Sequence, residues 1–241
     1  MVKICVDGGD ERFVRLAQNL PEYGASENAA YIFGNTKTLY EKIDTLPKDA
    51  LIMAFSPEKI CAERKVFNFL EDEEFLVENA RLTAEGAIVY AAKDMKAALR
   101  GTRCLVVGFG RIGQALTDLL VGLRALPVVY ARRMEVRRRA MQRGGIVAEN
   151  LHEGILGAKA VFSTPPEMVL SEEVLKFAEK DAVILDLASA PFGVDLDSAQ
   201  RLSLSARREG GIPGRYCPVS AAEALENAVK RIIDREGSNC T

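Results

Sequence analysis

The chain has 241 residues, enough for one large domain or two small ones and for a well-buried core. Its composition, 48% apolar and 27% charged, is that of a globular protein and excludes disorder, a collagen-like fold and a coiled coil as the main architecture. The net charge of −2 argues against a protein that binds nucleic acid by neutralising phosphates, and no apolar run approaches the roughly 18 residues of a membrane helix.

The rarest residue types limit the chemistry further. His152 is the single histidine, which excludes a histidine pair and a three-histidine metal site; we expect no metal and interpret His152 as structural or solvated. The cysteines are scattered and form no C-x-x-C pair, which favours reduced thiols and a cytoplasmic protein. They are Cys5, Cys61, Cys104, Cys217 and Cys240. The amino-terminal residues predict a strand and not a signal peptide.

Short β-branched runs alternate with helical segments along the first half, and this alternation predicts a parallel sheet with helices on both faces. A helix is predicted at residues 11–19, where Phe13 and Leu16 share one face, and it stops before Pro21. The strands of this half are predicted at residues 2–6, 30–33 and 51–55, with a further candidate at 75–77.

The middle of the chain contains an acidic run and a long helix. We interpret the acidic residues 71–74 as a solvated loop. The spacing predicts a helix over 84–99, with Gly101 as its C-cap, and this helix connects the two halves.

The second half gives a clearer pattern of strands and helices. An amphipathic helix follows a glycine loop, an arginine-rich helix ends at Gly144, and a last helix is predicted at 220–235. Six strands are predicted, at residues 103–107, 127–131, 145–148, 160–163, 182–187 and 202–206.

The whole pattern predicts an α/β protein of two domains. Residues 79–219 form a connecting helix and a doubly wound parallel sheet of the Rossmann type, which binds a dinucleotide. Residues 1–78 form a smaller α/β domain on the substrate side, and the helix at 220–236 is a candidate to join it.

The glycine loop carries the strongest functional signal. It has the form G-x-G-x-x-G directly after a strand and opens an amphipathic helix, the context that confirms a dinucleotide fingerprint. The glycines permit a tight turn, close approach of a pyrophosphate and close packing of the helix on the strand. The predicted cofactor-binding residues here are Gly108, Phe109, Gly110, Arg111, Ile112 and Gly113.

The end of the following strand indicates which cofactor binds. An acidic residue there bonds the ribose 2′-hydroxyl of NAD, whereas an arginine accommodates the 2′-phosphate of NADP. This chain has Arg132 and Arg133, and no acidic residue before Glu135. The sequence therefore predicts NADP, with NAD less favoured. The remaining arginines of this stretch, Arg137 among them, are interpreted as a solvated helix face.

Several separated motifs together resemble a known family, the A subunits of dipicolinate synthase from endospore-forming bacteria. They cover most of residues 79–232 together with the first strand and turn. In chain order they are Gly8-Gly9-Asp10-Glu11-Arg12, Asn79 with Thr83-Ala84-Glu85-Gly86, the glycine loop, Ala131-Arg132, Asp186-Leu187-Ala188-Ser189 with Pro191, Gly193 and Asp195, and Gly211-Ile212-Pro213-Gly214 with Pro218 and Ala221.

The chain departs from the family at several places, among them the turn at Ser220 and Ala222, the more polar segment 206–209 and the two that follow. Between Phe55 and Asn79 it lacks a stretch that the family has, so the first domain is short. Phe192 stands where the family has the first of two glycines.

The resemblance implies an oxidoreductase that forms dipicolinate from a hydroxy-tetrahydrodipicolinate or dihydrodipicolinate precursor, a branch of the lysine pathway used in sporulation. A nicotinamide cofactor would accept the hydride. The implied partners are a small dicarboxylate substrate and a B subunit, with no nucleic acid and no membrane, and the implied location is the cytoplasm of the mother cell. A homo-oligomer stays open.

Position and resemblance together give candidates for the rest of the site. Thr164 and Pro165 end one strand and are predicted to bind cofactor; Asp186 and Ser189 end another and are predicted to be catalytic. The alternatives are a proline-terminated loop for the first pair and a turn or cap for the second.

Four further residues are predicted to bind substrate, and one to act in catalysis. Arg12 can hold a carboxylate in bidentate fashion, unless it is merely an exposed residue beside an Asp10 N-cap. Glu85 is predicted as a catalytic acid or base, with a first-turn helix acid as the alternative. Thr83, Gly211 and Gly214 complete the substrate set, the two glycines as part of a backbone turn.

Two other functions remain open. The chain could be a non-catalytic NADP-binding scaffold or regulatory homologue, or a dehydrogenase of another small carboxylic acid, because a fold does not fix a substrate.

Overall fold

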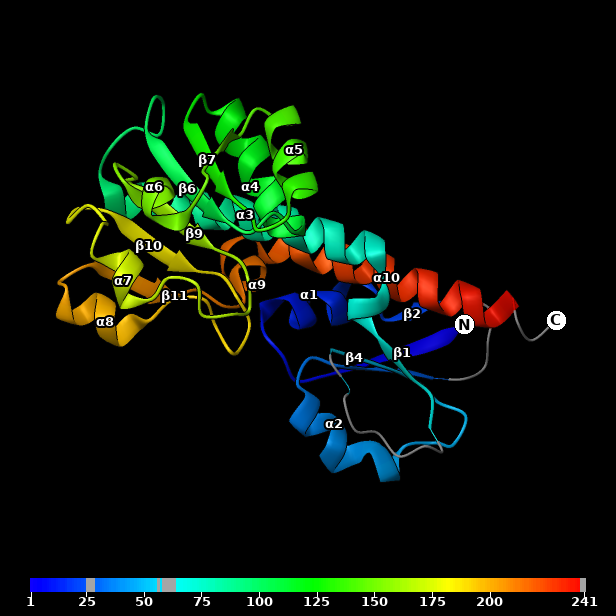
Figure 1. The fold of residues 1–241 in the computed structure, drawn as a ribbon. Coiled ribbons are helices and arrows are strands. Elements are labelled where there is room, and N and C mark those ends of the chain that lie inside the picture. The colour runs from blue at the N-terminus through cyan, green and yellow to red at the C-terminus, as the bar shows by residue number, and fades with distance from the viewer. Residues whose placement is uncertain (25–28, 56, 58–63, 239–241) are drawn as a thin grey trace. The chain divides into compact units, whose positions relative to one another are not determined.

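The computed structural model describes residues 1–24, 29–55, 57 and 64–238 and divides the chain into two compact units (Figure 1). Unit 1 consists of Met1–Leu82 and Pro213–Thr241, and Unit 2 consists of Thr83–Ile212. No helix of the described residues is long and apolar enough to cross a bilayer. Both units have the α/β architecture that the sequence predicts.

Unit 1 is built on a five-stranded sheet in the order β2-β1-β3-β4-β5. All neighbours are parallel except β2, which pairs antiparallel with β1 at the edge. The strands are β1 (Val2–Asp7), β2 (Glu22–Tyr23), β3 (Ala30–Phe33), β4 (Leu51–Ala54) and β5 (Val66–Asn68). Strand β2 is not predicted from the sequence, because two residues are too few to show a period.

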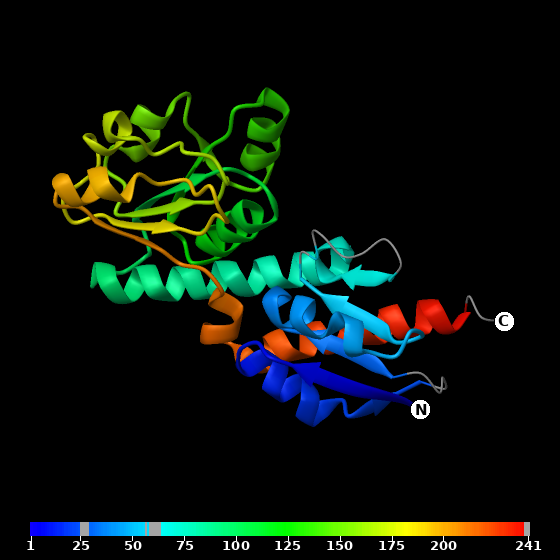
Figure 2. The same cartoon turned by 90° about the horizontal axis from the view of Figure 1, so that it is seen from below.

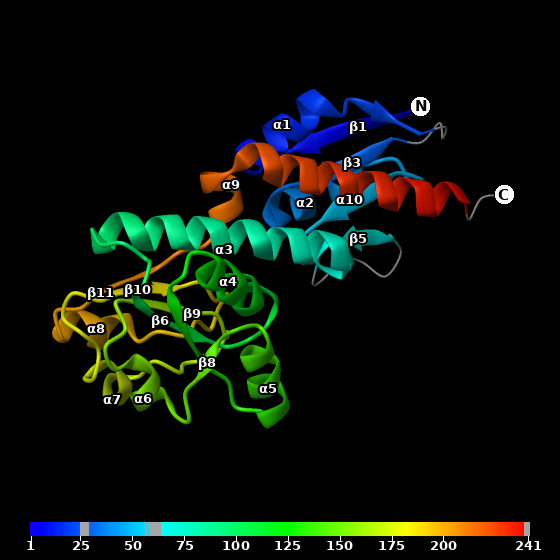
Figure 3. The ribbon, with the colours of Figure 1, turned by 90° about the horizontal axis from the view of Figure 1, so that it is seen from above.

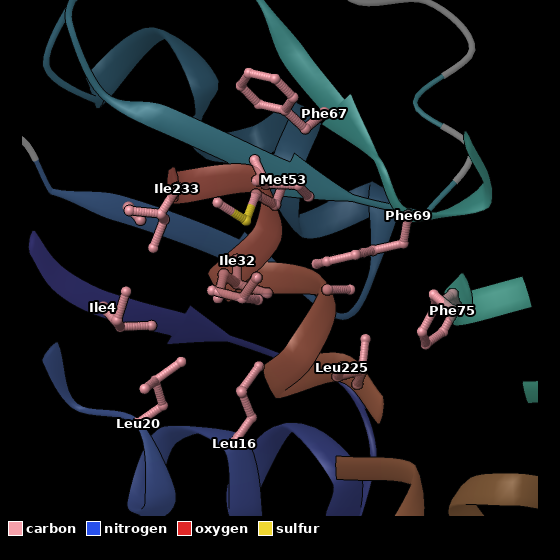
Figure 4. Packing of buried hydrophobic residues seen from close by; sticks show 14 of the residues in the cluster. Ile4, Leu16, Leu20, Ile32, Met53, Phe67, Phe69, Phe75, Leu225 and Ile233 are labelled. Atoms are coloured by element: carbon pink, nitrogen blue, oxygen red, sulfur yellow. The ribbon is translucent and has the colours of Figure 1, made fainter. Parts of the chain in front are cut away.

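Alternate residues of these strands fill two cores, one on each face of the sheet. On one face, Ile32 and Met53 pack with Leu16 of α1 (Glu11–Asn19) and with Leu225 of α10 (Pro218–Ser238), as Figure 4 shows. On the other face, Phe33 and Ile52 pack against Leu39 of α2 (Thr36–Lys42) and against the short 3₁₀ helix η1 (Ile43–Thr45). Helix α10, near the carboxyl terminus, therefore covers one face of the sheet that the amino-terminal residues form.

Helix α3 (Glu73–Met95) begins earlier than predicted and is unbroken (Figure 2). The predicted strand at 75–77 is wrong, since these residues lie in the first turns of α3, and the fourth parallel strand is β5. The predicted acidic loop is also wrong: Glu71 ends the 3₁₀ helix η2 (Phe69–Glu71), and Asp72 accepts a hydrogen bond from Phe75 N at 2.9 Å, as a helix N-cap does.

Unit 2 is built on a six-stranded parallel sheet in the order β11-β10-β9-β6-β7-β8. Chain order reverses between β6 and β9, which is the arrangement of a doubly wound dinucleotide-binding sheet. The strands are β6 (Arg103–Val107), β7 (Leu126–Tyr130), β8 (Ile146–Val147), β9 (Ala160–Ser163), β10 (Val183–Asp186) and β11 (Ser205–Arg208). The six predicted strands are confirmed, with β11 placed a few residues later than expected.

Helices cover both faces of this sheet (Figure 3). Helix α4 lies on one face, and α6, α7 and α8 lie on the other, where Leu105, Val161 and Ile184 pack against Ile155 and Leu175. The helices of Unit 2 are α4 (Arg111–Gly122), α5 (Met134–Gln142), α6 (Leu151–Ile155), α7 (Glu172–Leu175) and α8 (Leu196–Arg201), and α9 (Ile212–Tyr216) follows them.

Two turns differ from the prediction. Helix α3 ends at Met95, so Gly101, with a φ of +74°, belongs to the later turn into β6 and is not the C-cap. The segment after Gly211 is the short helix α9 and not an open turn; only Gly211 itself, with a φ of +63°, has the left-handed conformation.

Candidate functional site

The loop between β6 and α4 is held by two glycines that leave no room for a side chain. A Cβ on Gly108, whose φ is +86°, would lie 2.5 Å from the Thr164 hydroxyl oxygen. A Cβ on Gly113 would overlap the carbonyl oxygen of Gly108. Helix α4 can therefore start directly above the end of β6, which is the close packing that the fingerprint predicts.

Gly110 differs from both, because a Cβ on it would meet nothing within 4 Å. It is the N-cap of the 12-residue helix α4, and it makes no side-chain capping bond. The space beside Gly110 is thus open, and a helix N-terminus offers unpaired N–H groups and the positive end of its dipole, which are the groups that bind a pyrophosphate. The residues present therefore fit a dinucleotide.

The other residues of the glycine loop point in different directions. Phe109 is buried in the protein, Ile112 is half-buried, and Arg111 is exposed. The side chain of Phe109 therefore contributes packing, and any contact it makes with a cofactor comes from its backbone.

The two arginines after β7 have different surroundings. Arg132 donates two hydrogen bonds to Glu167, at 3.1 and 2.7 Å. Arg133 is exposed, and its guanidinium makes no hydrogen bond or ion pair within the described parts of the chain. One of the two predicted phosphate ligands is therefore already paired with a carboxylate, and the other is available.

Arg137 corrects the interpretation of the arginine-rich helix as a solvated face. Its side chain is only 14% exposed and donates from Nε to the carbonyl oxygen of Ala131 at 2.6 Å. It also bonds the side chain and the carbonyl oxygen of Glu149. Arg137 thus fixes the end of β7, which the periodicity of α5 alone does not reveal.

The loop after β9 lies against the glycine loop. The hydroxyl of Thr164 donates to the carbonyl oxygen of Val107 at 2.9 Å, and the Pro165 ring packs beside Gly108. Both residues shape the loop that would meet the cofactor; their direct contact with it stays a prediction. Glu167, three residues further on, was missed, because its partner Arg132 lies 35 residues away in the sequence.

Asp186 ends β10 and is 1% exposed. Its carboxylate accepts hydrogen bonds from the N–H groups of Ala188, Gly193 and Val194, at 3.2, 3.0 and 3.1 Å. These bonds hold the loop that carries the exposed Ser189. These bonds show that Asp186 holds the loop after β10 in place. The catalytic roles of Asp186 and Ser189 stay predictions.

Phe192 has a φ of +68°, the left-handed conformation that favours glycine. Phe192 therefore has a backbone conformation that a glycine would adopt without strain. The Arg208 guanidinium lies 4.0 Å from the centre of the Phe192 ring, a cation–π contact that stabilises the strained residue.

In Unit 1, Arg12 is paired with Asp10. Arg12 Nε and Nη2 donate to the two carboxylate oxygens at 2.8 and 2.7 Å, while Asp10 also caps α1 by accepting from Arg12 N. Burial raises the pKa of the Asp10 carboxyl, but the hydrogen bonds and charge of Arg12 lower it more, so the net pKa lies below 3.8. The pair packs on the backbone of Gly214, where a Cβ would lie 2.8 Å from Arg12 Nε.

Thr83 and Glu85 lie within α3, with Thr83 buried and Glu85 exposed. Since α3 begins at Glu73, the alternative interpretation of Glu85 as a first-turn acid is wrong. Their predicted roles toward substrate and catalysis remain predictions.

Free thiols and possible metal ligands add no further site. Among the described cysteines, Cys5, Cys104 and Cys217 form no disulfide, and burial raises the pKa of Cys104 to about 12, which makes its thiol unreactive. Cys61 and Cys240 lie outside the described residues. In the part of the chain that the structure describes, histidine, cysteine and carboxylate side chains nowhere gather as a metal-binding group.

Comparison with known proteins gives one clear relative in sequence. No family model matches this chain. The A subunit of dipicolinate synthase of Bacillus subtilis (strain 168) is 28% identical over 174 residues, which make up 71% of this chain and 59% of that protein. The match therefore spans less than two thirds of the relative's length.

Solved structures give the fold. The A chain of dipicolinate synthase from Bacillus subtilis has a TM-score of 0.82 at 21% identity and covers 99% of this chain and 97% of its own. The A subunit of the enzyme from Bacillus halodurans also has a TM-score of 0.82, at 19% identity, with 96% and 97% covered. D-lactate dehydrogenase from Escherichia coli has a TM-score of 0.62 at 13% identity, with 99% and 98% covered. The fold is thus an α/β dinucleotide-binding fold of two domains.

Proposed function

We propose that this chain, which resembles the A subunit of dipicolinate synthase in sequence and fold, is an oxidoreductase that uses a nicotinamide dinucleotide. The observation that carries the proposal is the glycine loop, in which Gly108 and Gly113 are packed shut while Gly110 is open at the start of α4. A structural turn would need the first two properties and not the third. The cofactor, when bound, supplies the hydride acceptor.

NADP is the proposed cofactor. Among the described residues, Arg133 supplies an unpaired guanidinium at the end of β7, where an NAD-binding protein commonly has an acidic residue. The α4 N-terminus would hold the pyrophosphate, and the loop at Thr164 and Pro165 would border it.

The proposed substrate is a small cyclic dicarboxylate, either dihydrodipicolinate, which loses two hydrogens to become dipicolinate, or hydroxy-tetrahydrodipicolinate, which must also lose one water. The relative is named as one subunit of a synthase, which supports a second polypeptide as partner, and we propose that this partner is the B subunit. Arg12 is proposed to bind a substrate carboxylate, with Thr83, Gly211 and Gly214 as further substrate residues. Glu85, Asp186 and Ser189 are the proposed catalytic set, with Asp186 acting by holding the Ser189 loop.

The test has two parts. Calorimetric titration of the chain with NADP⁺ and NAD⁺ should give binding, tighter for NADP⁺. Addition of the lysine-pathway precursor together with the B subunit should then produce dipicolinate and reduced cofactor in equal amounts. Binding without turnover would favour the non-catalytic scaffold, and turnover of a different hydroxy acid would favour another dehydrogenase.

Variants of the proposed catalytic set sharpen this test. Glu85→Gln and Ser189→Ala should each lower kcat while leaving cofactor affinity unchanged, because neither residue belongs to the glycine loop or to the end of β7. If either variant keeps the wild-type kcat, the substituted residue is not catalytic.

A further inference from the structure

The ion pair between Arg132 and Glu167 joins the loops on either side of the glycine loop. Arg132 follows β7, and Glu167 lies in the loop after β9. Strand β6, whose end carries the glycine loop, lies between β9 and β7 in the sheet (Figure 1). The pair therefore forms at the edge where the dinucleotide would lie.

The pair is accessible to a ligand. The side chains of Arg132 and Glu167 are 69% and 52% exposed, and both guanidinium bonds go to the two oxygens of one carboxylate. A phosphate binds a guanidinium through the same two N–H groups. A 2′-phosphate and the Glu167 carboxylate would thus compete for Arg132, whereas a ribose 2′-hydroxyl carries no charge with which to compete.

We propose that Glu167 sets the preference between NADP and NAD by holding Arg132. The inference rests on the proposed nucleotide-binding function. Arg133 is the arginine free to take the phosphate, and Glu167 limits what Arg132 adds. Glu167 is thus a specificity-determining residue that weakens NADP binding and leaves NAD binding nearly unchanged.

The test is a titration of the full chain with NADP⁺ and NAD⁺ by calorimetry. Glu167→Gln removes the carboxylate charge and should tighten NADP⁺ binding by about fivefold, the range of an exposed ion pair, with NAD⁺ affinity unchanged. Asp181→Asn is the matched control: it removes one charge from an exposed pair with Lys159, and both residues precede their strands at the opposite edge of the same sheet. It should change neither affinity.

A double-mutant cycle tests whether Glu167 acts through Arg132. In an Arg132→Gln background, Glu167→Gln should no longer tighten NADP⁺ binding. An unchanged ratio of the two affinities in Glu167→Gln, or weaker NADP⁺ binding, overturns the inference while the proposed function stands. A wild-type chain that binds neither dinucleotide overturns the proposed function itself, and this inference with it.

Discussion

Glycines in this chain differ in what a methyl group would meet, and the difference separates packing from ligand contact. At Gly110 the methyl would enter open space at the start of α4. At Gly214 it would overlap a carboxylate oxygen of Asp10. A substitution by alanine should therefore weaken cofactor binding at Gly110 and lower the stability of the fold at Gly214.

Gly110→Ala should weaken NADP⁺ binding by about tenfold, because its methyl would occupy the approach of the pyrophosphate. Thermal stability should change little. Gly122→Ala, at the other end of α4 and equally open, is the control and should bind NADP⁺ normally. Equal affinities for the two variants would show that no ligand approaches Gly110.

Gly214→Ala should lower the free energy of unfolding by about 2 kcal/mol, because the Asp10–Arg12 pair must shift to admit the methyl. Urea denaturation measures the change. Gly210→Ala, where a methyl meets nothing within 4 Å, should cost much less. If the two variants are equally stable, the Asp10–Arg12 pair does not press on Gly214.

Among the elements, α3 and α10 are joined by one carboxylate. Asp72 caps α3 and accepts two hydrogen bonds from Arg231 of α10, at 2.9 and 2.8 Å. Burial raises the pKa of Asp72, but the bonds from Arg231 and Phe75 lower it more, so the net pKa is below 3.8. The contribution of this ion pair to stability is therefore present above pH 3.8 and is lost as the pH falls through the folded-state pKa.

Asp72→Asn isolates the ion pair, because asparagine caps a helix as well as aspartate does. At pH 7 it should lower the free energy of unfolding by about 1.5 kcal/mol, and it should flatten the loss of stability on acidification below pH 3.8. Denaturant titrations at several pH values measure both effects. Asp49→Asn, exposed in the same unit, is the control and should retain the wild-type pH dependence; a wild-type pH dependence in Asp72→Asn would contradict the assignment.

Elements with a clear period were predictable, and their partners across the sheet were not. The bounds of α1, β3, β6 and β9 follow from their own residues. The start of α3 does not follow from its own residues, because Phe75 and Val77 favour strands in isolation. Packing of Phe75 in the Unit 1 core decides their conformation. The same limit applies to the site: the motif predicts the glycine loop, but Glu167 and Arg137 act through bonds that only the folded sheet brings together.

At the scale of the whole molecule, each unit has a core of its own. Leu225 of α10 is fully buried in Unit 1, and Leu105 of β6 is fully buried in Unit 2. We expect the two units to open separately, since neither core shares these residues with the other.

Leu225→Ala should lower the stability of Unit 1 by about 3 kcal/mol, the usual cost of a buried leucine. Hydrogen exchange should show faster exchange in β1, β3 and β4, with β6, β9 and β10 unchanged. Leu105→Ala is the matched variant and should give the reverse pattern. Uniform loss of protection in either variant would mean that the chain opens as a single cooperative body.

The division of Unit 1 into two separated segments has a consequence for the order of synthesis. When Leu82 leaves the ribosome, α10 has not yet been synthesised. The face of the β1–β5 sheet that α10 covers is then exposed, because Leu225, which packs on Ile32 and Met53, is still missing. All of Thr83–Ile212 must be translated first, which takes roughly 7 to 26 seconds. Unit 2 can thus complete its fold before Unit 1, although Unit 1 begins earlier in the sequence. The nascent chain exposes an apolar sheet face of Unit 1 during that interval.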